Sequence, residues 1–125
     1  MKKIVATEKA PGAIGPYSQA VEAGNIIYVS GQLPINPASG QFAGETIEEQ
    51  TRQSLTNMKN ILESSGYSVD GVVKTTVFLK DIADFAAMNG VYAQFFAKDC
   101  PARSAFQVAN LPKDAKIEIE AIAVK

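Results

Sequence analysis

Residues 116–124 read Lys-Ile-Glu-Ile-Glu-Ala-Ile-Ala-Val, with an apolar side chain at every second position. Because successive side chains of a β-strand point to opposite faces, this alternation predicts a strand with one buried face. The buried face would consist of Ile117, Ile119, Ala121 and Ala123. The other face begins with two carboxylates, Glu118 and Glu120, and becomes apolar at Ile122 and Val124.

The chain before this strand contains further segments of strand composition. Gly24-Asn25 is a turn signal between two apolar runs, so residues 17–23 and 26–31 are expected to form a hairpin. Residues 72–79 are rich in β-branched side chains and predict a buried strand. The remaining strands are expected at residues 3–6 and 104–108.

The clearest helix signal begins at Thr46. Thr46 and Glu49 have the spacing of a capping box, in which each side chain bonds the backbone of the other residue. Apolar side chains then follow at helical spacing. They are Ile47, Leu55, Met58, Ile61 and Leu62, with Thr51 filling the gap. Gly66 supplies a left-handed stop after Ser65.

A second helix is expected over residues 82–97, with Asp81 as its cap. Pro101 prevents this helix from continuing. Its inner side would carry Phe85, Met88, Tyr92, Phe95 and Phe96. The order of strands, helix, strand, helix and strands predicts an α+β fold, with two helices on one face of a sheet and a single domain over residues 1–125.

Charge and composition limit the partners of the chain. Twelve basic and thirteen acidic residues give a net charge of −1, whereas proteins that bind nucleic-acid phosphates have a basic excess. The apolar run after Met1 is too short for a signal peptide, and no stretch approaches the ~18 apolar residues of a membrane span. Cys100 is the only cysteine, so no internal disulfide can form. We therefore expect a soluble cytoplasmic protein with no nucleic-acid or membrane partner.

The sequence contains no histidine. This absence excludes the usual Ser-His and Cys-His activation of a nucleophile. It also removes the commonest zinc ligand, and one thiol cannot build a structural metal site. Catalysis would depend on carboxylates, arginine, tyrosine, hydroxyls and backbone groups, with no metal and no cofactor.

Charged candidates for such chemistry each have two interpretations. Glu118 and Glu120 belong either to a solvated half-face that meets a covering loop or neighbouring subunit, or to the rim of a pocket. In a pocket, partial desolvation would suit one of them to proton transfer. Arg103, at the entrance to a strand, forms either a surface salt bridge or a bidentate site for a carboxylate.

The uncharged candidates are Tyr17 and the pair Ser30-Gly31. Tyr17 ends a loop-like segment, so its hydroxyl either belongs to the core or points into a cleft. Ser30 is either a turn serine or a group of the same cleft. A glycine at the end of a strand, as at position 31, allows another backbone or a ligand to approach closely.

Taken together, several segments resemble motifs of the RidA/YjgF family, also called L-PSP. They are residues 13–20 (Ala-Ile-Gly-Pro-Tyr-Ser-Gln-Ala), 29–34 (Val-Ser-Gly-Gln-Leu-Pro), 73–79, 101–104 (Pro-Ala-Arg-Ser), 111–114 (Leu-Pro-Lys-Asp) and 117–123. The motifs extend over nearly the whole chain in family order, and their joint occurrence is specific. The chain departs from the family at Ala105, where many members have a cysteine, so a thiol role is absent here.

The resemblance implies a chorismate-mutase-like fold of the bacillus type, assembled as a homotrimer with pockets at the subunit interfaces. It implies a cofactor-independent 2-iminobutanoate/2-iminopropanoate deaminase, which hydrolyses reactive enamine and imine acids such as 2-aminoacrylate to 2-keto acids and ammonia. The implied catalytic residues are Arg103 for the substrate carboxylate, Glu118 for the attacking water, and Tyr17. The implied substrate-binding positions are Arg103, Ser30, Gly31, Asn89 and Ala105, the last through its backbone N–H.

Two other functions stay open from the sequence. Some family members are associated with endoribonuclease or translation-inhibitor activity, which would require phosphate-binding charge. The other alternative is a non-catalytic protein that binds keto acids or acts like a chaperone.

Overall fold

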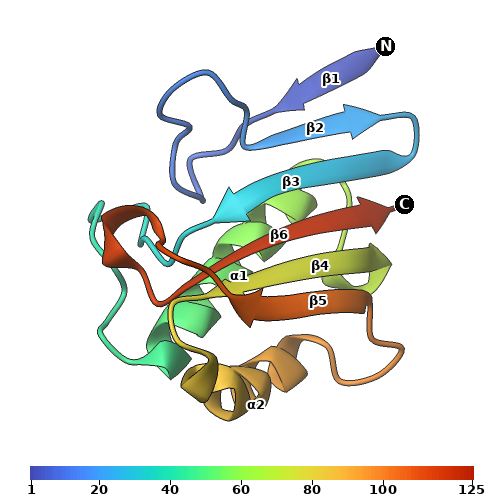
Figure 1. Ribbon diagram of the computed structural model, residues 1–125. Coiled ribbons are helices and arrows are strands. Elements are labelled where there is room, and N and C mark those ends of the chain that lie inside the picture. The colour runs from blue at the N-terminus through green and yellow to red at the C-terminus, as the bar shows by residue number, and fades with distance from the viewer.

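A sheet and a layer of helices make up the chain in the computed structural model, which describes residues 1–125 (Figure 1). The sheet has six strands in the order β1-β2-β3-β6-β4-β5. Only β4 and β5 are parallel neighbours, and the other pairs are antiparallel. The strands are β1 (Lys2–Val5), β2 (Ala20–Ala23), β3 (Ile26–Gln32), β4 (Val72–Leu79), β5 (Ala102–Gln107) and β6 (Ile117–Val124).

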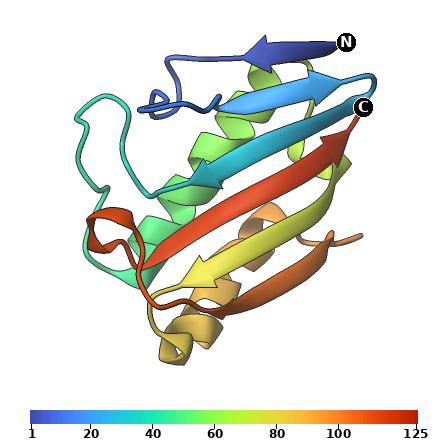
Figure 2. The same cartoon turned by 45° about the horizontal axis from the view of Figure 1, so that its top comes forward.

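Both helices, α1 (Ile47–Ser64) and α2 (Phe85–Phe95), cover the same face of the sheet, as two views of the chain show (Figures 1 and 2). Short 3-10 turns lie at Val69–Gly71, Ile82–Asp84 and Pro112–Asp114. The α+β architecture expected from the sequence is therefore confirmed. No helix has the length and apolar character needed to cross a membrane.

The alternating strand at the end of the chain, β6, lies in the middle of the sheet between β3 and β4. Its predicted apolar face is buried against the helices, with Ile117, Ile119 and Ala123 at 0% exposure and Ala121 at 3%. Side chains on its other face are half-buried or exposed. The alternation of buried and more exposed side chains along β6 thus distinguishes the helix-covered face of the sheet from its open face.

Helix α1 begins and ends as its sequence predicts. The Thr46 hydroxyl accepts a hydrogen bond from the Glu49 N–H at 3.1 Å, and the Glu49 carboxylate accepts one from the Thr46 N–H at 3.3 Å. Gly66, after the C-cap, has a φ of +78°, the left-handed conformation that glycine tolerates best. All five predicted apolar positions of α1 are buried.

Helix α2 is shorter than the 82–97 range expected from the sequence. The Asp81 carboxylate does accept a hydrogen bond from the Ala83 N–H at 2.9 Å, but it caps the 3-10 turn Ile82–Asp84 that precedes α2. The helix ends at Phe95, because Phe96 leaves the helical conformation with a ψ of 74°. Met88 and Tyr92 are buried as expected.

The first hairpin strand starts at Ala20 rather than at residue 17. Gln19 explains the difference, because its buried amide bonds the loop before it instead of extending the strand. The amide nitrogen donates to the carbonyls of Thr7, Ala10 and Pro11 at 3.0, 3.3 and 2.8 Å, and the amide oxygen accepts from the Thr7 N–H at 2.7 Å. Residues 17 and 18 therefore belong to the loop that leads to the cavity described below.

Strand β4 spans the predicted residues 72–79, and the remaining strand boundaries lie within two residues of the predictions. The largest difference is in β5, which begins at Ala102 instead of residue 104 because its parallel ladder with β4 is already formed there. Non-local pairing of this kind sets strand ends, and composition alone does not reveal it.

Candidate active site

A bulge in β3 creates the centre of the candidate site. Two residues of β3, Ser30 and Gly31, oppose the single residue Glu120 of β6. A bulge bends a strand and redirects its side chains. Gly31 leaves room at this point for the carboxylate of Glu118, since a methyl group at position 31 would overlap Oε2 of that side chain. The sequence suggested that another backbone or a ligand approaches Gly31, whereas the group that lies against it in the chain is the Glu118 side chain.

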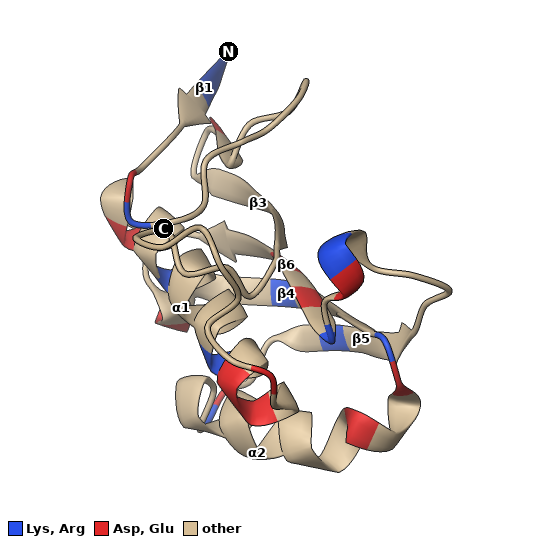
Figure 3. Cartoon of the chain, turned by 90° about the vertical axis from the view of Figure 1, so that its left-hand side faces the viewer, with Lys and Arg blue, Asp and Glu red and all other residues tan.

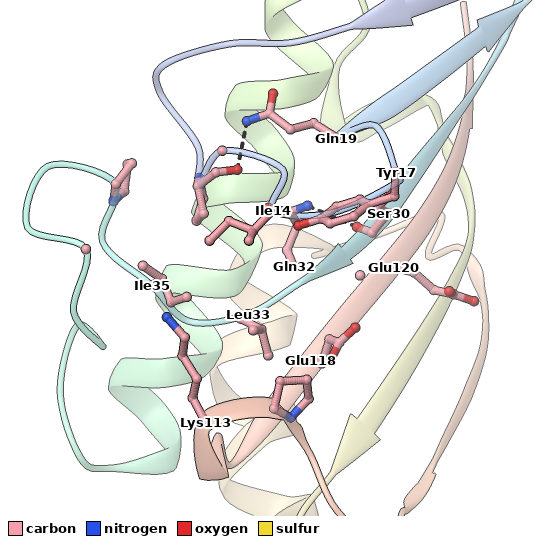
Figure 4. A pocket seen from close by; sticks show the side chains of 16 residues that line it. Ile14, Tyr17, Gln19, Ser30, Gln32, Leu33, Ile35, Lys113, Glu118 and Glu120 are labelled. Atoms are coloured by element: carbon pink, nitrogen blue, oxygen red, sulfur yellow. Dashed lines mark hydrogen bonds between the residues drawn. The ribbon is translucent and has the colours of Figure 1, made fainter.

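A cavity of about 740 Å³ opens beside the bulge. It is lined by the end of β3, the loop that contains Ile14 and Tyr17, and the turn at Pro112-Lys113. Figure 4 shows Glu118 pointing into this cavity from β6, whereas the carboxylate of Glu120 points away from its centre. The volume is in the range of pockets that hold small molecules.

Glu118 has the properties of a group suited to proton transfer. Burial raises the pKa of its carboxyl above the usual value, and the negative charge of Glu120 raises it further. No group of the chain donates a hydrogen bond to this carboxylate to offset the desolvation. A carboxylate in such surroundings is a stronger base than one in water.

Tyr17 and Ser30 have different roles in the walls of the cavity. Tyr17 is half-exposed, at 51%, and its ring lies beside Ser30 and Gln32 (Figure 4). The Ser30 hydroxyl donates a hydrogen bond of 2.6 Å to the Ser18 carbonyl, and the Ser30 N–H donates to the Gln19 carbonyl at 2.9 Å. Ser30 therefore fixes the loop that carries Tyr17, and only the lone pairs of its hydroxyl are left for a ligand.

Arg103 is held firmly without any acidic partner. Its guanidinium donates a hydrogen bond of 2.8 Å to Oδ1 of Asn89 on α2. The guanidinium carbon also lies 4.7 Å from the ring centre of Tyr92 and 5.4 Å from that of Phe85, in the geometry of cation–π contacts. Neither of the two ion pairs of the chain includes Arg103. The salt bridge considered from the sequence is thus not formed within the chain.

The backbone beside Arg103 offers a further donor. In the ladder of β4 and β5, the Val108 N–H donates to the Leu79 carbonyl at 2.9 Å. Parallel ladders use the N–H groups of alternate residues, so the N–H of Ala105 points the other way. Because β5 is the last strand of the sheet, this N–H faces the free edge.

The predicted site residues form two groups on opposite faces of the sheet. Arg103 pairs with Thr75, which is buried under the helices, so Arg103 and Asn89 lie on the helix-covered face. Glu118 pairs with Phe78 on the open face, where the cavity with Tyr17 also lies. The structure thus brings Glu118, Tyr17, Ser30 and Gly31 together, and separately Arg103, Asn89 and Ala105. It does not bring the two groups together within one chain.

Three buried side-chain amides that the sequence analysis did not single out hold the loops of the cavity. Besides Gln19, they are Asn57 and Gln50 of α1. Asn57 donates to the carbonyls of Leu33 and Ile35 at 3.1 and 2.9 Å. Gln50 donates to the Gly44 carbonyl at 3.0 Å and accepts from the Lys116 N–H at 2.8 Å. Gln50 and Asn57 could have been found from the sequence, because they are polar residues on the apolar face of the predicted helix.

Charge is distributed evenly over the chain. Figure 3 shows basic and acidic residues interspersed along most of the ribbon, apart from the two lysines at the start of β1. No group of three or more His, Cys, Asp or Glu side chains is placed to hold a metal ion.

Comparison with known proteins gives consistent matches over the whole chain. The model of the family described as Endoribonuclease L-PSP matches residues 7–125. A RutC family protein of Pyrococcus horikoshii is 55% identical over 125 residues, covering 100% of this chain and 99% of the relative. The 2-iminobutanoate/2-iminopropanoate deaminase of Escherichia coli is 54% identical over 128 residues, covering 100% and 99%.

Solved structures agree with these matches. The YjgF gene product of E. coli superimposes with a TM-score of 0.95 at 54% identity, covering 98% of each chain. E. coli TdcF, whose structure contains bound serine, also has a TM-score of 0.95, at 49% identity and the same coverage.

Proposed function

Because the chain belongs to the endoribonuclease L-PSP family, we propose that it is a deaminase that hydrolyses 2-imino acids to 2-keto acids and ammonia. The name of the E. coli relative supports this activity. The observation that carries the proposal is the presence of a desolvated carboxylate, Glu118, in a small-molecule cavity, together with a guanidinium, Arg103, that no carboxylate of the chain neutralises.

Arg103 would bind the carboxylate of the substrate. Its planar fork suits bidentate hydrogen bonding to an anion, and its contacts with Asn89 and Tyr92 fix its orientation before the substrate arrives. The outward N–H of Ala105 and the N–H of Gly31 would be further donors. The bound serine of TdcF has the same arrangement of a carboxylate next to a carbon that carries nitrogen.

Glu118 would act as the general base, and then as the acid. It removes a proton from a water molecule while the water oxygen bonds to the carbon of the protonated imine and the C=N electron pair moves to nitrogen. The product of this step is a neutral carbinolamine. Glu118 returns the proton to the nitrogen, the C–N bond breaks with its electron pair leaving on ammonia, and the hydroxyl gives its proton to Glu118 as the C=O bond forms. Tyr17 would orient the substrate, and the reaction requires no cofactor.

We further propose that one copy supplies Arg103 and a neighbouring copy supplies Glu118, in a homotrimer. A single small acid cannot contact both residues in one copy, because they lie on opposite faces of the sheet. The open face also carries exposed apolar side chains, including Tyr28 at 48%, Phe106 at 44% and Val124 at 38%. Association of copies over this face would remove these side chains from water.

Mixing two inactive variants tests the shared site. Differently tagged Arg103→Ala and Glu118→Gln chains are co-expressed, and mixed assemblies are isolated through both tags. If each site takes its arginine and its glutamate from different copies, every isolated mixed trimer has one restored site, about a third of its sites. The assay generates 2-aminoacrylate from serine with a dehydratase and follows the loss of the imine. Activity no higher than the sum of the two parents would show that the residues do not combine across copies.

RNA cleavage is the second candidate, because the family description includes it. The net charge of −1 and the absence of histidine argue against it. Incubation of purified protein with single-stranded RNA should yield no cleavage above the level of the Arg103→Ala variant. Cleavage by the unmodified protein alone would favour the nuclease. A protein that binds 2-ketobutyrate without accelerating imine loss would instead be a metabolite sensor.

A further inference from the structure

One basic side chain of this chain lines the cavity beside Glu118. Of the residues that line it, two are acidic, Glu118 and Glu120, and one is basic, Lys113. Figure 4 shows the Lys113 side chain extending from its turn toward Ile35 at the edge of the cavity. The Lys113 ammonium forms no ion pair and no hydrogen bond within the chain. The two ion pairs of the chain are made by Lys80 and Lys125.

The turn that carries Lys113 has an unusual backbone. Lys113 has a φ of 57° and Asp114 a φ of 60°, so two consecutive residues other than glycine are in the left-handed region. This conformation is uncommon for such residues and persists where surrounding contacts impose it. The Asp114 carboxylate pairs with Lys80 at 2.9 Å, and Gln50 holds the Lys116 N–H just beyond the turn. These contacts direct the Lys113 side chain toward the cavity.

From this arrangement we infer that Lys113 captures small carboxylate anions at the mouth of the cavity and guides them past Glu118 and Glu120. This inference rests on the proposed function, since it concerns how the anionic 2-imino acid enters the same site. Two carboxylates repel an incoming anion, and the Lys113 ammonium at the edge of the cavity offsets that repulsion within a Debye length. Arg103 then holds the carboxylate in the reacting position.

The test compares three substitutions of Lys113 with a control that changes the net charge equally. We expect Lys113→Gln to raise KM roughly 3- to 10-fold, with kcat changed less than about twofold. Lys113→Arg should keep the KM of the unmodified protein because the charge is retained. Lys113→Gly should raise KM like Lys113→Gln, although glycine favours the left-handed backbone of the turn. Lys59→Gln, on the exposed side of α1, should leave KM unchanged.

Salt dependence separates capture by charge from the shape of the turn. The Debye length falls from roughly 30 Å at about 0.01 M salt to roughly 8 Å at about 0.15 M. KM of the unmodified protein should rise over this range, and KM of Lys113→Gln should be nearly flat. Equal KM values and salt slopes for Lys113→Gln and Lys59→Gln would overturn the inference. Failure of Lys113→Arg to retain the low KM would also overturn it, because the turn and not the charge would then be responsible.

Binding of 2-ketobutyrate, measured by calorimetry at the same two salt concentrations, keeps this test distinct from the test of the proposed function. If the unmodified protein does not hydrolyse imines, the deaminase proposal fails, yet a weaker and salt-insensitive Kd of Lys113→Gln would still support capture by Lys113. If hydrolysis is present but Lys113→Gln binds 2-ketobutyrate like the unmodified protein, the deaminase proposal stands and the role of Lys113 is rejected.

Discussion

Arg103 and Glu118 lie two strands apart in the same sheet, yet the chain holds them in opposite ways. Arg103 is fixed by contacts, with Asn89 as its hydrogen-bond acceptor and the rings of Tyr92 and Phe85 against its guanidinium. Glu118 has room for its carboxylate because Gly31 has no side chain. No group of the chain donates a hydrogen bond to this carboxylate. One group is oriented by its neighbours and the other is deprived of solvation.

The difference corresponds to the two tasks of the proposed reaction. A group that binds an anion gains from a fixed geometry, because the cost of ordering it has been met before the anion arrives. A general base gains from a raised pKa, which hydrogen bonds to its charged form would lower. The structure thus suggests that removal of Arg103 abolishes binding, whereas removal of Glu118 abolishes chemistry.

Arg103→Ala should have the largest effect. We expect imine hydrolysis to fall by roughly 10²- to 10³-fold, because the substrate loses its charge-assisted anchor. Arg103→Lys should lose most of the activity as well, since an ammonium cannot form the same paired hydrogen bonds. The coupled dehydratase assay measures both variants, and circular dichroism and the size of the assembly show that they remain folded. Near-normal activity in folded Arg103→Ala would reject its role.

Glu118→Gln should lower kcat by roughly 10²- to 10³-fold while 2-ketobutyrate still binds. The variant should also melt at a higher temperature near neutral pH. Folding raises the pKa of Glu118, so its stabilising contribution is present at low pH and is lost as the pH rises through the raised value. An uncharged glutamine avoids this loss. Persisting turnover would mean that another group activates the water.

Asn89→Ala should have an intermediate effect. Loss of the 2.8 Å bond frees the guanidinium of Arg103 without removing its charge, so we expect KM to rise roughly 5- to 20-fold. The kcat should change less, because Glu118 is untouched. Steady-state kinetics distinguish the two parameters, and Gln94→Ala, at an exposed position of the same helix, serves as the control. An unchanged KM would show that the aromatic contacts orient Arg103 without Asn89.

Glu120→Gln should have the smallest effect, visible mainly in the pH profile. The negative charge of Glu120 raises the pKa of Glu118, although less than burial does. Because the base acts when it is deprotonated, removal of that charge should move the acidic limb of kcat to lower pH. A shift toward higher pH would contradict the proposed coupling of the two carboxylates.

Local signals allowed most of the fold to be predicted. The capping box at Thr46, the stop at Gly66 and the alternation along β6 each depend on residues close together in the sequence, and each is confirmed. The predicted start of β2 was wrong because the Gln19 amide donates hydrogen bonds to carbonyls up to twelve residues away. The predicted end of α2 was also wrong, since no glycine or proline follows Phe95 directly to indicate where the helix stops.

The site could be predicted only in part, for a related reason. Alternation along β6 placed Glu118 on the face opposite the buried isoleucines, but the face of Arg103 depends on how β5 pairs with β4. Tyr92 and Phe85 were expected in the core from their helical spacing, and nothing local indicated that they also support an arginine. Lys113 was part of a recognised motif, yet its direction follows from a backbone conformation that composition does not reveal.

The bulge in β3 makes this strand unusually sensitive to changes in length. Val29 and Gln32 are both buried although three positions separate them, so the extra residue shifts the phase of the alternation halfway along the strand. Deletion of one residue of the bulge would give a regular ladder with Val29 and Gln32 still on the buried face, but it would remove the bend at which Gly31 leaves room for the Glu118 carboxylate. Loops of this chain are the places where insertions and deletions can accumulate, whereas the residue count between Val29 and Gln32 decides how Glu118 and Gly31 meet.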